Sequence, residues 1–261
     1  MHEALLAGTS SAELLAFLNG LPSVDACRAE LERRAGGRFR TIFPDEGPYR
    51  RDLYKKHMEF IAAGAEYRER LFLKANRVGG TMLGAYEVTA HATGRYPHWW
   101  NGRRFKTAVN CWVAGDTAET TRNILQLELL GPPGQPHLQG TTMLPVDSIY
   151  HVTPGRITNA VSMIYVRHVS GDLSTIEFKS FDQGRRSFQG TQKHVVWLDE
   201  ECPDDVYAEC LLRTMETGEF LGGCILLTFT PLLGLTPLVA SFLEDKALED
   251  VQTERAKEGA R

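Results

Sequence analysis

The spacing of hydrophobic and polar residues changes along the chain in a way that predicts strands separated by helices. Short apolar runs, typical of strands buried on both faces, begin at Leu71 and span residues 195–198 and 224–228. Apolar side chains at helical spacing span residues 82–90, 116–129 and 203–217, and Asp116 is placed to cap the second of these helices. Strands alternating with helices predict an α/β fold with a mainly parallel central sheet, covered by helices on both faces.

Further segments complete this arrangement. Apolar and polar side chains alternate well enough over residues 107–114 to predict a strand. Residues 49–70 form a charged amphipathic helical stretch that leads into the strand at Leu71. Residues 163–169 and 175–181 predict a β-hairpin. The sequence therefore predicts a central sheet with some antiparallel pairing.

The start of the chain differs from the rest. Apolar residues at helical spacing predict two short helices, at residues 10–18 and 23–34. A turn-rich stretch at residues 43–48 follows them. We therefore expect a helical N-terminal extension over residues 1–44 and a main domain over residues 45–261, with a charged, exposed helix at its end.

Residues 71–81 are typical of a strand that enters a phosphate-binding loop. Such a loop surrounds an anion with backbone N–H groups, and Gly79 and Gly80 permit the close backbone approach. The standard pattern is G-x-x-x-x-G-K-[ST]. Here Lys74 replaces the first glycine and Gly80 occupies the position of the lysine. Thr81 is placed to offer its hydroxyl to Mg²⁺.

Lys74 is the only lysine of this loop, and a bound triphosphate needs a lysine to neutralise it. Its side chain is long enough to span back across the loop, and Arg77 adds a second positive charge. We predict that ATP contacts the loop residues Lys74, Ala75, Asn76, Arg77, Val78, Gly79, Gly80 and Thr81. A plain strand–turn–helix with a surface lysine and arginine is the alternative, and this segment alone leaves both open.

Asp199 follows a run of apolar residues and lies at the C-terminal end of the predicted strand, where α/β sheets bind ligands. We expect Asp199 to hold Mg²⁺, directly or through water, and Glu200 to act on the attacking water as a general base. An acidic first turn of a helix would explain the same residues, but less well beside a phosphate-binding loop. Thr228 and Thr230 end the next strand, where they either sense a γ-phosphate or simply cap the strand.

Composition narrows the class of protein. The apolar share of 43% and charged share of 24% are ordinary for a globular protein, and no apolar run is long enough to span a bilayer. The five cysteines form no C-x-x-C pair, which favours reduced thiols. A formal net charge of -4 excludes a global basic field, so any DNA contact must be local or shared among subunits.

The loop at Lys74, the strand ending at Asp199 and the strand ending at Thr228, in this order, resemble the ATPase domain of the large terminase subunit of tailed phages. Residues 180–191, which lead directly into the second of these strands, are similar to the same family. The resemblance covers roughly residues 49–238 and is specific only as an ensemble.

The resemblance implies a P-loop NTPase of the RecA/ASCE type, with Walker A and Walker B motifs, over residues 45–261. It implies a motor that uses ATP and Mg²⁺ to package double-stranded viral DNA into a procapsid in the host cell cytoplasm. The expected partners are DNA, the portal protein, the small terminase subunit and further copies of the chain in a ring. In the family, a residue at the position of Arg77 contacts the γ-phosphate, and the coupling motif maps to Thr228 and Thr230. A second arginine often comes from the neighbouring subunit; the candidates are Arg122, Arg156, Arg185 and Arg186.

This sequence departs from the family in the loop and in length. Most members carry the lysine immediately before Thr81, and some carry it at the start of the loop, as Lys74 does here. The family usually continues into an RNase H-like nuclease domain. No second acidic cluster in this sequence is typical of a nuclease, so we expect the motor domain alone.

Two rival functions stay open. The first rival to the packaging motor is a non-hydrolysing nucleotide- or DNA-binding structural module with a degenerate loop. The second is another P-loop enzyme, such as a helicase. Retention of Thr81, Asp199 and Glu200 argues against the first rival. Residues 188–191 and 228–231 favour a terminase over the second.

Overall fold

The computed structural model describes residues 37–75, 77–218, 220–232 and 234–243. In this part of the chain a seven-stranded sheet has the strand order β1-β7-β6-β2-β5-β4-β3. The predicted helices at residues 10–18 and 23–34, and the charged tail after residue 243, lie outside the described residues. The boundary between residues 44 and 45 therefore stays a prediction.

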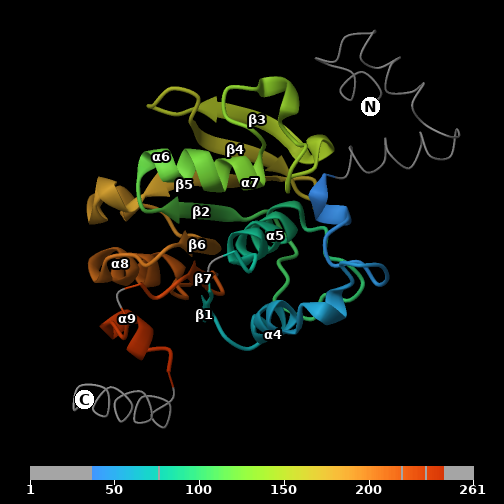
Figure 1. Cartoon of the computed structure of the whole chain (residues 1–261). Helices are drawn as coiled ribbons and strands as arrows, with labels where there is room; N and C mark the ends of the chain where they lie inside the picture. The colour runs from blue at the N-terminus through green and yellow to red at the C-terminus, as the bar shows by residue number, and fades with distance from the viewer. Residues whose placement is uncertain (1–36, 76, 219, 233, 244–261) are drawn as a thin grey trace, which may run out of the picture.

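Five neighbouring strands of the sheet are parallel: β1 (Glu69–Leu73), β7 (Cys224–Phe229), β6 (Val195–Asp199), β2 (Asn110–Gly115) and β5 (Leu173–Ser180). Beyond β5, strand β4 (Val161–Arg167) pairs with β5 in the antiparallel direction, and β3 (Ile149–Pro154) pairs with β4 in the same way (Figure 1). The mainly parallel sheet and the β4–β5 hairpin confirm the predictions. The sequence did not reveal β3, because a register shift between Ile149 and His151 interrupts its alternation.

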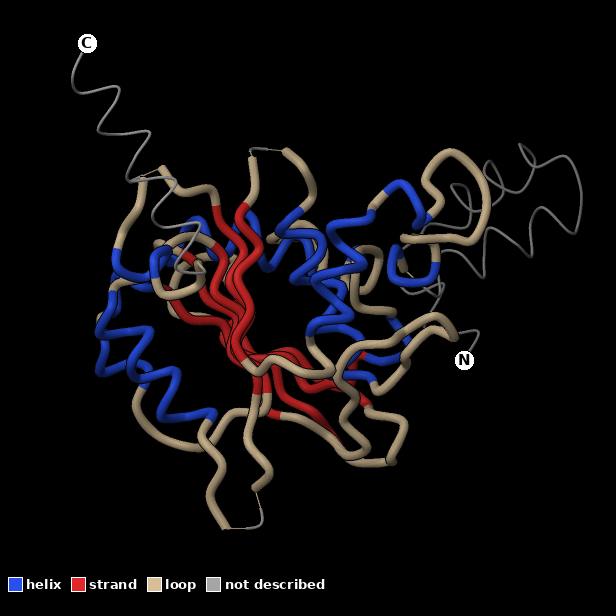
Figure 2. The backbone as a smooth tube through the Cα atoms, turned by 90° about the horizontal axis from the view of Figure 1, so that it is seen from below, coloured by secondary structure: helices blue, strands red, loops and turns tan. Residues whose placement is uncertain are grey.

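Helices cover both faces of the sheet, as predicted (Figure 2). One face packs against α5 (Gly80–Thr93) and carries Val195 and Trp197 of β6. The other face packs against α8 (Asp204–Thr214) and α9 (Pro237–Ala240). Side chains of a strand alternate between faces, so a fully apolar strand such as β6 fills both cores at once.

Two predicted helices differ in detail. The helix expected from Asp116 has Thr117 as its N-cap, because the Thr117 side chain accepts a hydrogen bond from the backbone of Thr120. It continues as α6 (Ala118–Thr120), a π-helical segment (Thr121–Gln126) and α7 (Leu127–Leu129). The stretch at residues 49–70 is not a single helix: a 3₁₀ turn (Arg51–Leu53) precedes α4 (Lys55–Ala63), which ends at Gly64 before β1.

The described cysteines, Cys111, Cys202, Cys210 and Cys224, are buried and free, and Cys27 lies outside the described residues. The described four therefore form no disulfide, and the reduced state of the thiols stays a prediction. Within the same part of the chain, none of the helices has both the length and the apolar character that a membrane crossing requires.

A buried ion pair joins β1 to α5. Arg70 Nη2 donates to Glu87 Oε1 at 2.5 Å, and His91 Nε2 lies 3.2 Å from the same oxygen. Burial acts to raise the pKa of Glu87, but the charge of Arg70 and the contacts with His91 outweigh it, so the pKa is lowered. The pair fixes α5, and with it the loop before α5, against the edge strand.

We expect Glu87→Gln to destabilise the protein, because it leaves the Arg70 guanidinium buried without its counter-charge. Breaking a buried pair in this way costs about 3–5 kcal/mol. Glu59→Gln is the control, because Glu59 forms an exposed pair with Lys56 at 2.7 Å, and loss of such a pair costs about 1 kcal/mol or less. Urea denaturation of both variants measures the difference, and equal losses of stability would contradict the prediction.

Candidate functional site

The loop between β1 and α5 has the backbone of an anion-binding turn. Arg77 and Gly79 adopt left-handed conformations, with φ of 64° and 84°, and Gly79 is the N-cap of α5. Such turns direct consecutive N–H groups to one side, where they meet the N-terminus of a helix. Only a glycine adopts this conformation without cost, which explains Gly79. Asn76 of the predicted loop lies outside the described residues.

His57 of α4 contacts the loop from outside. Its Nε2 lies 3.0 Å from the carbonyl oxygen of Val78. Burial lowers the pKa of His57, so a neutral ring that donates from Nε2 suits this contact. The sequence did not identify His57, because the two residues lie 21 positions apart and no local pattern connects them.

Lys74 reaches back across the loop, as predicted. Its Nζ lies 3.3 Å from Thr81 Oγ1 and 3.4 Å from Asp199 Oδ1, and only 9% of the side chain is exposed. A Cβ atom on Gly80 would lie 2.3 Å from Lys74 Cδ. Any side chain at position 80 would therefore displace Lys74. The two departures from the standard loop pattern are thus sterically linked.

Asp199 lies at the carboxyl end of β6, beside the start of α5. Thr81 Oγ1 donates to Asp199 at 3.0 Å from Oδ2 and 3.2 Å from Oδ1. Thr228 Oγ1 donates to Oδ1 at 2.6 Å, because Thr228 is the partner of Asp199 in the neighbouring strand. The structure therefore brings together Lys74, Thr81 and Asp199, which the sequence predicted from two distant segments.

Glu200 follows Asp199 in an unusual backbone conformation. Its φ is 87°, and its N–H donates to the carbonyl of Thr228 at 3.3 Å. A non-glycine residue held in the left-handed region costs roughly 1–2 kcal/mol, and such residues cluster at functional sites. Burial, and next the charge of Asp199, raise the pKa of Glu200, while Lys74 opposes the change. This environment suits a carboxylate that accepts a proton.

The donor set near Thr81 fits Mg²⁺. Among the described residues, no three His, Cys, Asp or Glu side chains are grouped so as to hold a metal ion. Mg²⁺ does not need such a cage, because it commonly takes one or two protein oxygens and completes its shell with water and substrate phosphates. The Thr81 hydroxyl and Asp199 Oδ2, 3.0 Å apart, are oxygens of this kind.

The two threonines expected to couple hydrolysis to motion differ in position. Thr228 lies within β7 and is fully buried, with its hydroxyl bonded to Asp199. Thr230 lies just beyond the end of β7 and is partly exposed. Their coupling role stays a prediction.

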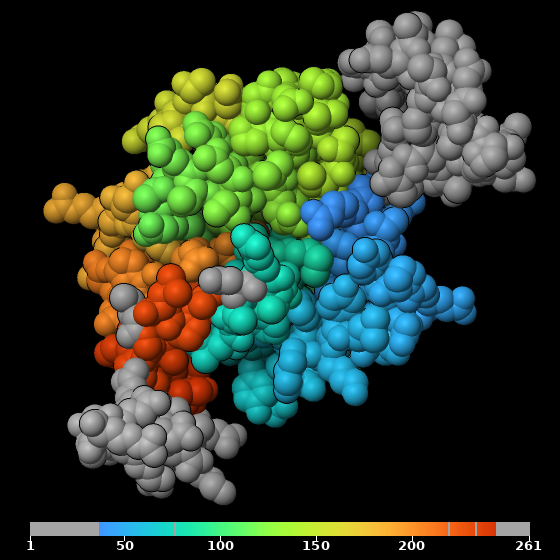
Figure 3. Space-filling model, in the orientation of Figure 1, coloured from blue at the N-terminus to red at the C-terminus, as the bar shows by residue number. Residues whose placement is uncertain are grey.

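A cavity of about 880 Å³ opens beside the loop. Its lining includes Tyr54 and Phe72, together with Lys74 and Val78. Phe242 adds to the lining from the C-terminal segment, which Figure 3 shows in red beside the cyan segment that leads into α5. Aromatic rings next to a phosphate-binding loop suit the flat base of a nucleotide.

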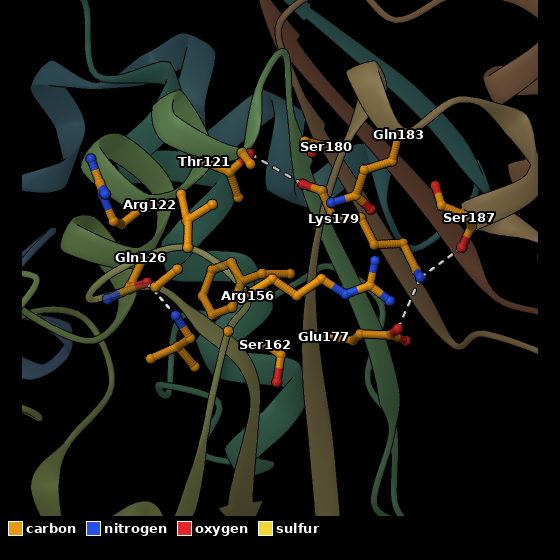
Figure 4. A pocket seen from close by; sticks show the side chains of 16 residues that line it. Thr121, Arg122, Gln126, Arg156, Ser162, Glu177, Lys179, Ser180, Gln183 and Ser187 are labelled. Atoms are coloured by element: carbon orange, nitrogen blue, oxygen red, sulfur yellow. Dashed lines mark hydrogen bonds and ion pairs between the residues drawn. The ribbon is translucent and has the colours of Figure 1, made fainter.

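Two of the arginines expected to act from a neighbouring subunit, Arg185 and Arg156, lie outside the phosphate-binding loop. Arg185 pairs with Glu209 at 3.0 Å. Arg156 extends into a separate cavity of about 480 Å³, toward Glu177 and Lys179 (Figure 4). None of the described loop residues lines that cavity. Arg77 is exposed on the phosphate-binding loop itself. The arginine supplied by a neighbouring subunit stays a prediction.

A mainly parallel sheet, a glycine-containing loop at the N-terminus of α5 and an aspartate at the end of β6 define a P-loop NTPase fold. The chain belongs to the terminase large subunit family, T4likevirus-type, N-terminal, whose model matches residues 71–259. The family resemblance predicted from the motifs is therefore confirmed.

Several individual terminases are similar to this chain. The large subunit of the terminase of Salmonella phage P22 is 36% identical over 210 residues, which cover 74% of this chain and 41% of that protein. The crystal structure of the HK97 bacteriophage large terminase matches with a TM-score of 0.48 and 16% identity, over 84% of this chain and 41% of that one. The large terminase of a thermophilic bacteriophage, solved in complex with ADP, matches with a TM-score of 0.45 and 13% identity, over 67% and 38%. The chain thus spans less than half the length of these proteins.

Proposed function

We propose that this chain binds and hydrolyses ATP, and that hydrolysis drives the translocation of double-stranded DNA during phage genome packaging. The observation that carries the proposal is the meeting of Lys74, Thr81 and Asp199 at the N-terminus of α5, within 3.0–3.4 Å of one another. These residues come from two segments more than a hundred positions apart. A chain that had lost nucleotide chemistry would have no reason to keep this arrangement.

Each residue has a defined task in the proposed reaction. The loop N–H groups and the Lys74 ammonium bind the phosphates, and Arg77 approaches the γ-phosphate. Thr81 and Asp199 hold Mg²⁺, which when bound neutralises charge on the phosphates. Glu200 takes a proton from the attacking water, a role that its raised pKa favours. The aromatic cavity beside the loop receives the base.

Membership of the terminase large subunit family supports the packaging role. We propose that the chain acts as a ring of identical copies on the portal protein in the host cell cytoplasm, with a small terminase subunit selecting the DNA. A neighbouring copy would supply the second arginine to the site.

The test of the proposal is a phosphate-release assay with ATP and Mg²⁺, with and without duplex DNA, together with a binding titration of labelled ATP. We expect saturable binding of ATP and hydrolysis that requires Mg²⁺. A chain that binds ATP without turnover, even when assembled on DNA, would support the non-hydrolysing module instead. Strand separation with no translocation of duplex DNA would favour a helicase.

We expect this chain to bind duplex DNA weakly and without preference for sequence. Its formal net charge of -4 offers no global attraction, so contacts must come from local basic residues and the phosphates. Affinity for DNA should fall steeply as the salt concentration rises. The logarithm of the binding constant should fall by roughly one unit per tenfold rise in salt for each phosphate contacted. Fluorescence anisotropy with two unrelated duplexes over a salt series measures this. Tight, salt-insensitive binding to one of the duplexes would contradict the prediction.

A further inference from the structure

A chain of two hydrogen bonds connects the interior of the sheet to Asp199. Trp197 Nε1 donates to Thr228 Oγ1 at 2.7 Å, and Thr228 Oγ1 donates to Asp199 Oδ1 at 2.6 Å. Trp197 and Thr228 are fully buried, and Asp199 is 4% exposed. Water therefore does not compete for these bonds, and their geometry depends on the protein alone.

The direction of this chain follows from the chemistry of its members. An indole N–H only donates, a carboxylate only accepts, and a hydroxyl has a single hydrogen to give. Because Thr228 accepts from Trp197, the hydrogen of its hydroxyl is directed to Asp199. Thr228 therefore has no hydrogen left for a phosphate oxygen while the chain is intact.

The indole of Trp197 is held in place by α5. A Cβ atom on Gly84 would lie 2.2 Å from Cε2 and 2.3 Å from Nε1 of Trp197, so the ring fills the space that a side chain on α5 would take. Packing this close leaves the ring no room to turn. The same helix begins at the loop and carries Thr81, so α5 fixes both the indole and the hydroxyl that faces Asp199.

The consequence is an asymmetric carboxylate. Oδ1 of Asp199 accepts the short bond from Thr228 at 2.6 Å and also lies 3.2 Å from Thr81 Oγ1 and 3.4 Å from Lys74 Nζ, whereas Oδ2 lies 3.0 Å from Thr81 Oγ1. The bond from Thr228 holds Oδ1 and thereby sets the orientation of the whole carboxylate, with Oδ2 slightly nearer to the Thr81 hydroxyl than Oδ1. We propose that Trp197 is a positioning residue that, through Thr228, orients Asp199 for the divalent cation. This inference rests on the proposed nucleotide site.

Groups that orient a metal ligand typically contribute about 10–100-fold to metal affinity. We therefore expect Trp197→Phe, which keeps most of the ring and removes the N–H, to weaken cation binding by about 10–100-fold. The nucleotide affinity measured in EDTA should stay unchanged, because the phosphate contacts of Lys74 and the loop are intact.

The fold offers a closely matched control. Trp112 in β2 is 1% exposed and donates its Nε1–H to Glu177 at 2.7 Å, the same length as the bond of Trp197. It belongs to the core on the opposite face of the sheet. Trp112→Phe therefore removes an indole hydrogen bond of the same length from the same sheet, and this bond has no part in the contacts of Asp199. It should leave cation binding unchanged.

The experiment titrates Mn²⁺, as a spectroscopic probe for Mg²⁺, into each variant of the 261-residue chain saturated with a non-hydrolysable ATP analogue. Electron paramagnetic resonance measures the free ion. The Mg²⁺ dependence of hydrolysis is recorded in parallel, and the half-saturating concentration should rise in Trp197→Phe while kcat at saturating Mg²⁺ changes little. A general loss of structure would lower kcat instead.

Variants at Thr228 test the same hydrogen-bond chain even if Trp197→Phe disturbs the fold. Thr228→Val removes the hydroxyl and should weaken Mn²⁺ binding as much as Trp197→Phe does, while Thr228→Ser should restore it. Because the indole acts through the hydroxyl, the double variant should be no weaker than Thr228→Val alone.

Several outcomes would overturn the proposal. Equal Mn²⁺ affinities in Trp197→Phe and Trp112→Phe would do so, as would additive losses in the double variant or equal binding by Thr228→Val and Thr228→Ser. A wild-type chain that binds no nucleotide would overturn the proposed function and this inference together. Normal nucleotide binding with an unaffected Trp197→Phe variant would overturn this inference alone.

Discussion

Glu200→Gln should bind ATP like the wild type and almost cease to hydrolyse it. Glutamine has nearly the same shape but cannot accept a proton from water, and loss of a positioned general base typically costs about 10²–10⁴-fold in rate. Lys74, Thr81 and Asp199 stay in place, so the phosphate and cation contacts are kept. Parallel measurement of binding by titration and of turnover by phosphate release separates the two effects.

The neighbouring Glu201 provides the control for this prediction. Its side chain accepts a hydrogen bond from Thr236, away from the contacts of Asp199. Glu201→Gln should therefore retain turnover, although it carries the same chemical change one position further on. If both variants lose activity equally, or if Glu200→Gln loses binding as well, Glu200 is not the base.

The sequence predicts the parallel strands well because their signal is local. β6 and β7 are continuous apolar runs, and a strand of that kind is buried on both faces wherever it lies in the sheet. The place of Asp199 and Glu200 at the end of a strand is predictable for the same reason, since they end such a run. In contrast, β3 lies at the edge of the sheet with an irregular register, so its side chains do not alternate cleanly.

The parts of the site that the sequence did not predict are contacts between distant segments. His57 meets Val78, and Trp197 reaches Thr228 across 31 positions, with no pattern in the sequence to connect them. The N-cap of the helix before the π-helical segment was misplaced by one residue for a related reason. Asp116 and Thr117 are both good caps, and the hydroxyl of Thr120 decides between them by completing a capping box with Thr117.

Lys74→Ala should lose hydrolysis and weaken ATP binding together. Lys74 is the ammonium that the structure places beside Thr81 and Asp199, and a triphosphate in a partly buried loop needs compensating charge. A hydrogen bond to a charged group contributes about 1.5–3 kcal/mol, which corresponds to roughly 10–100-fold in affinity. Labelled-ATP titration and phosphate release measure the two losses.

Lys193→Ala is the matched control for this variant. Lys193 is 8% exposed and its Nζ lies 3.4 Å from a carboxylate oxygen of Glu177, close to the 9% and 3.4 Å of Lys74 with Asp199. Lys193→Ala should lower the free energy of unfolding about as much as Lys74→Ala does, while leaving ATP binding intact. Equal loss of binding in both variants would show that Lys74 acts through the fold and not on the phosphates.

Substitutions at Gly80 test whether Lys74 and Gly80 form one adaptation. A methyl group at position 80 would lie 2.3 Å from Lys74 Cδ, so Gly80→Ala should displace the lysine and reduce activity in the wild-type background. After Lys74→Ala that clash is gone, so Gly80→Ala should have little further effect, and Gly80→Lys should restore part of the binding and turnover. The ammonium would then start from the position at which the standard loop pattern carries it. A wild-type rate in Lys74→Ala would show that another residue neutralises the phosphates, and an equal effect of Gly80→Ala in both backgrounds would show that the two positions are not one adaptation.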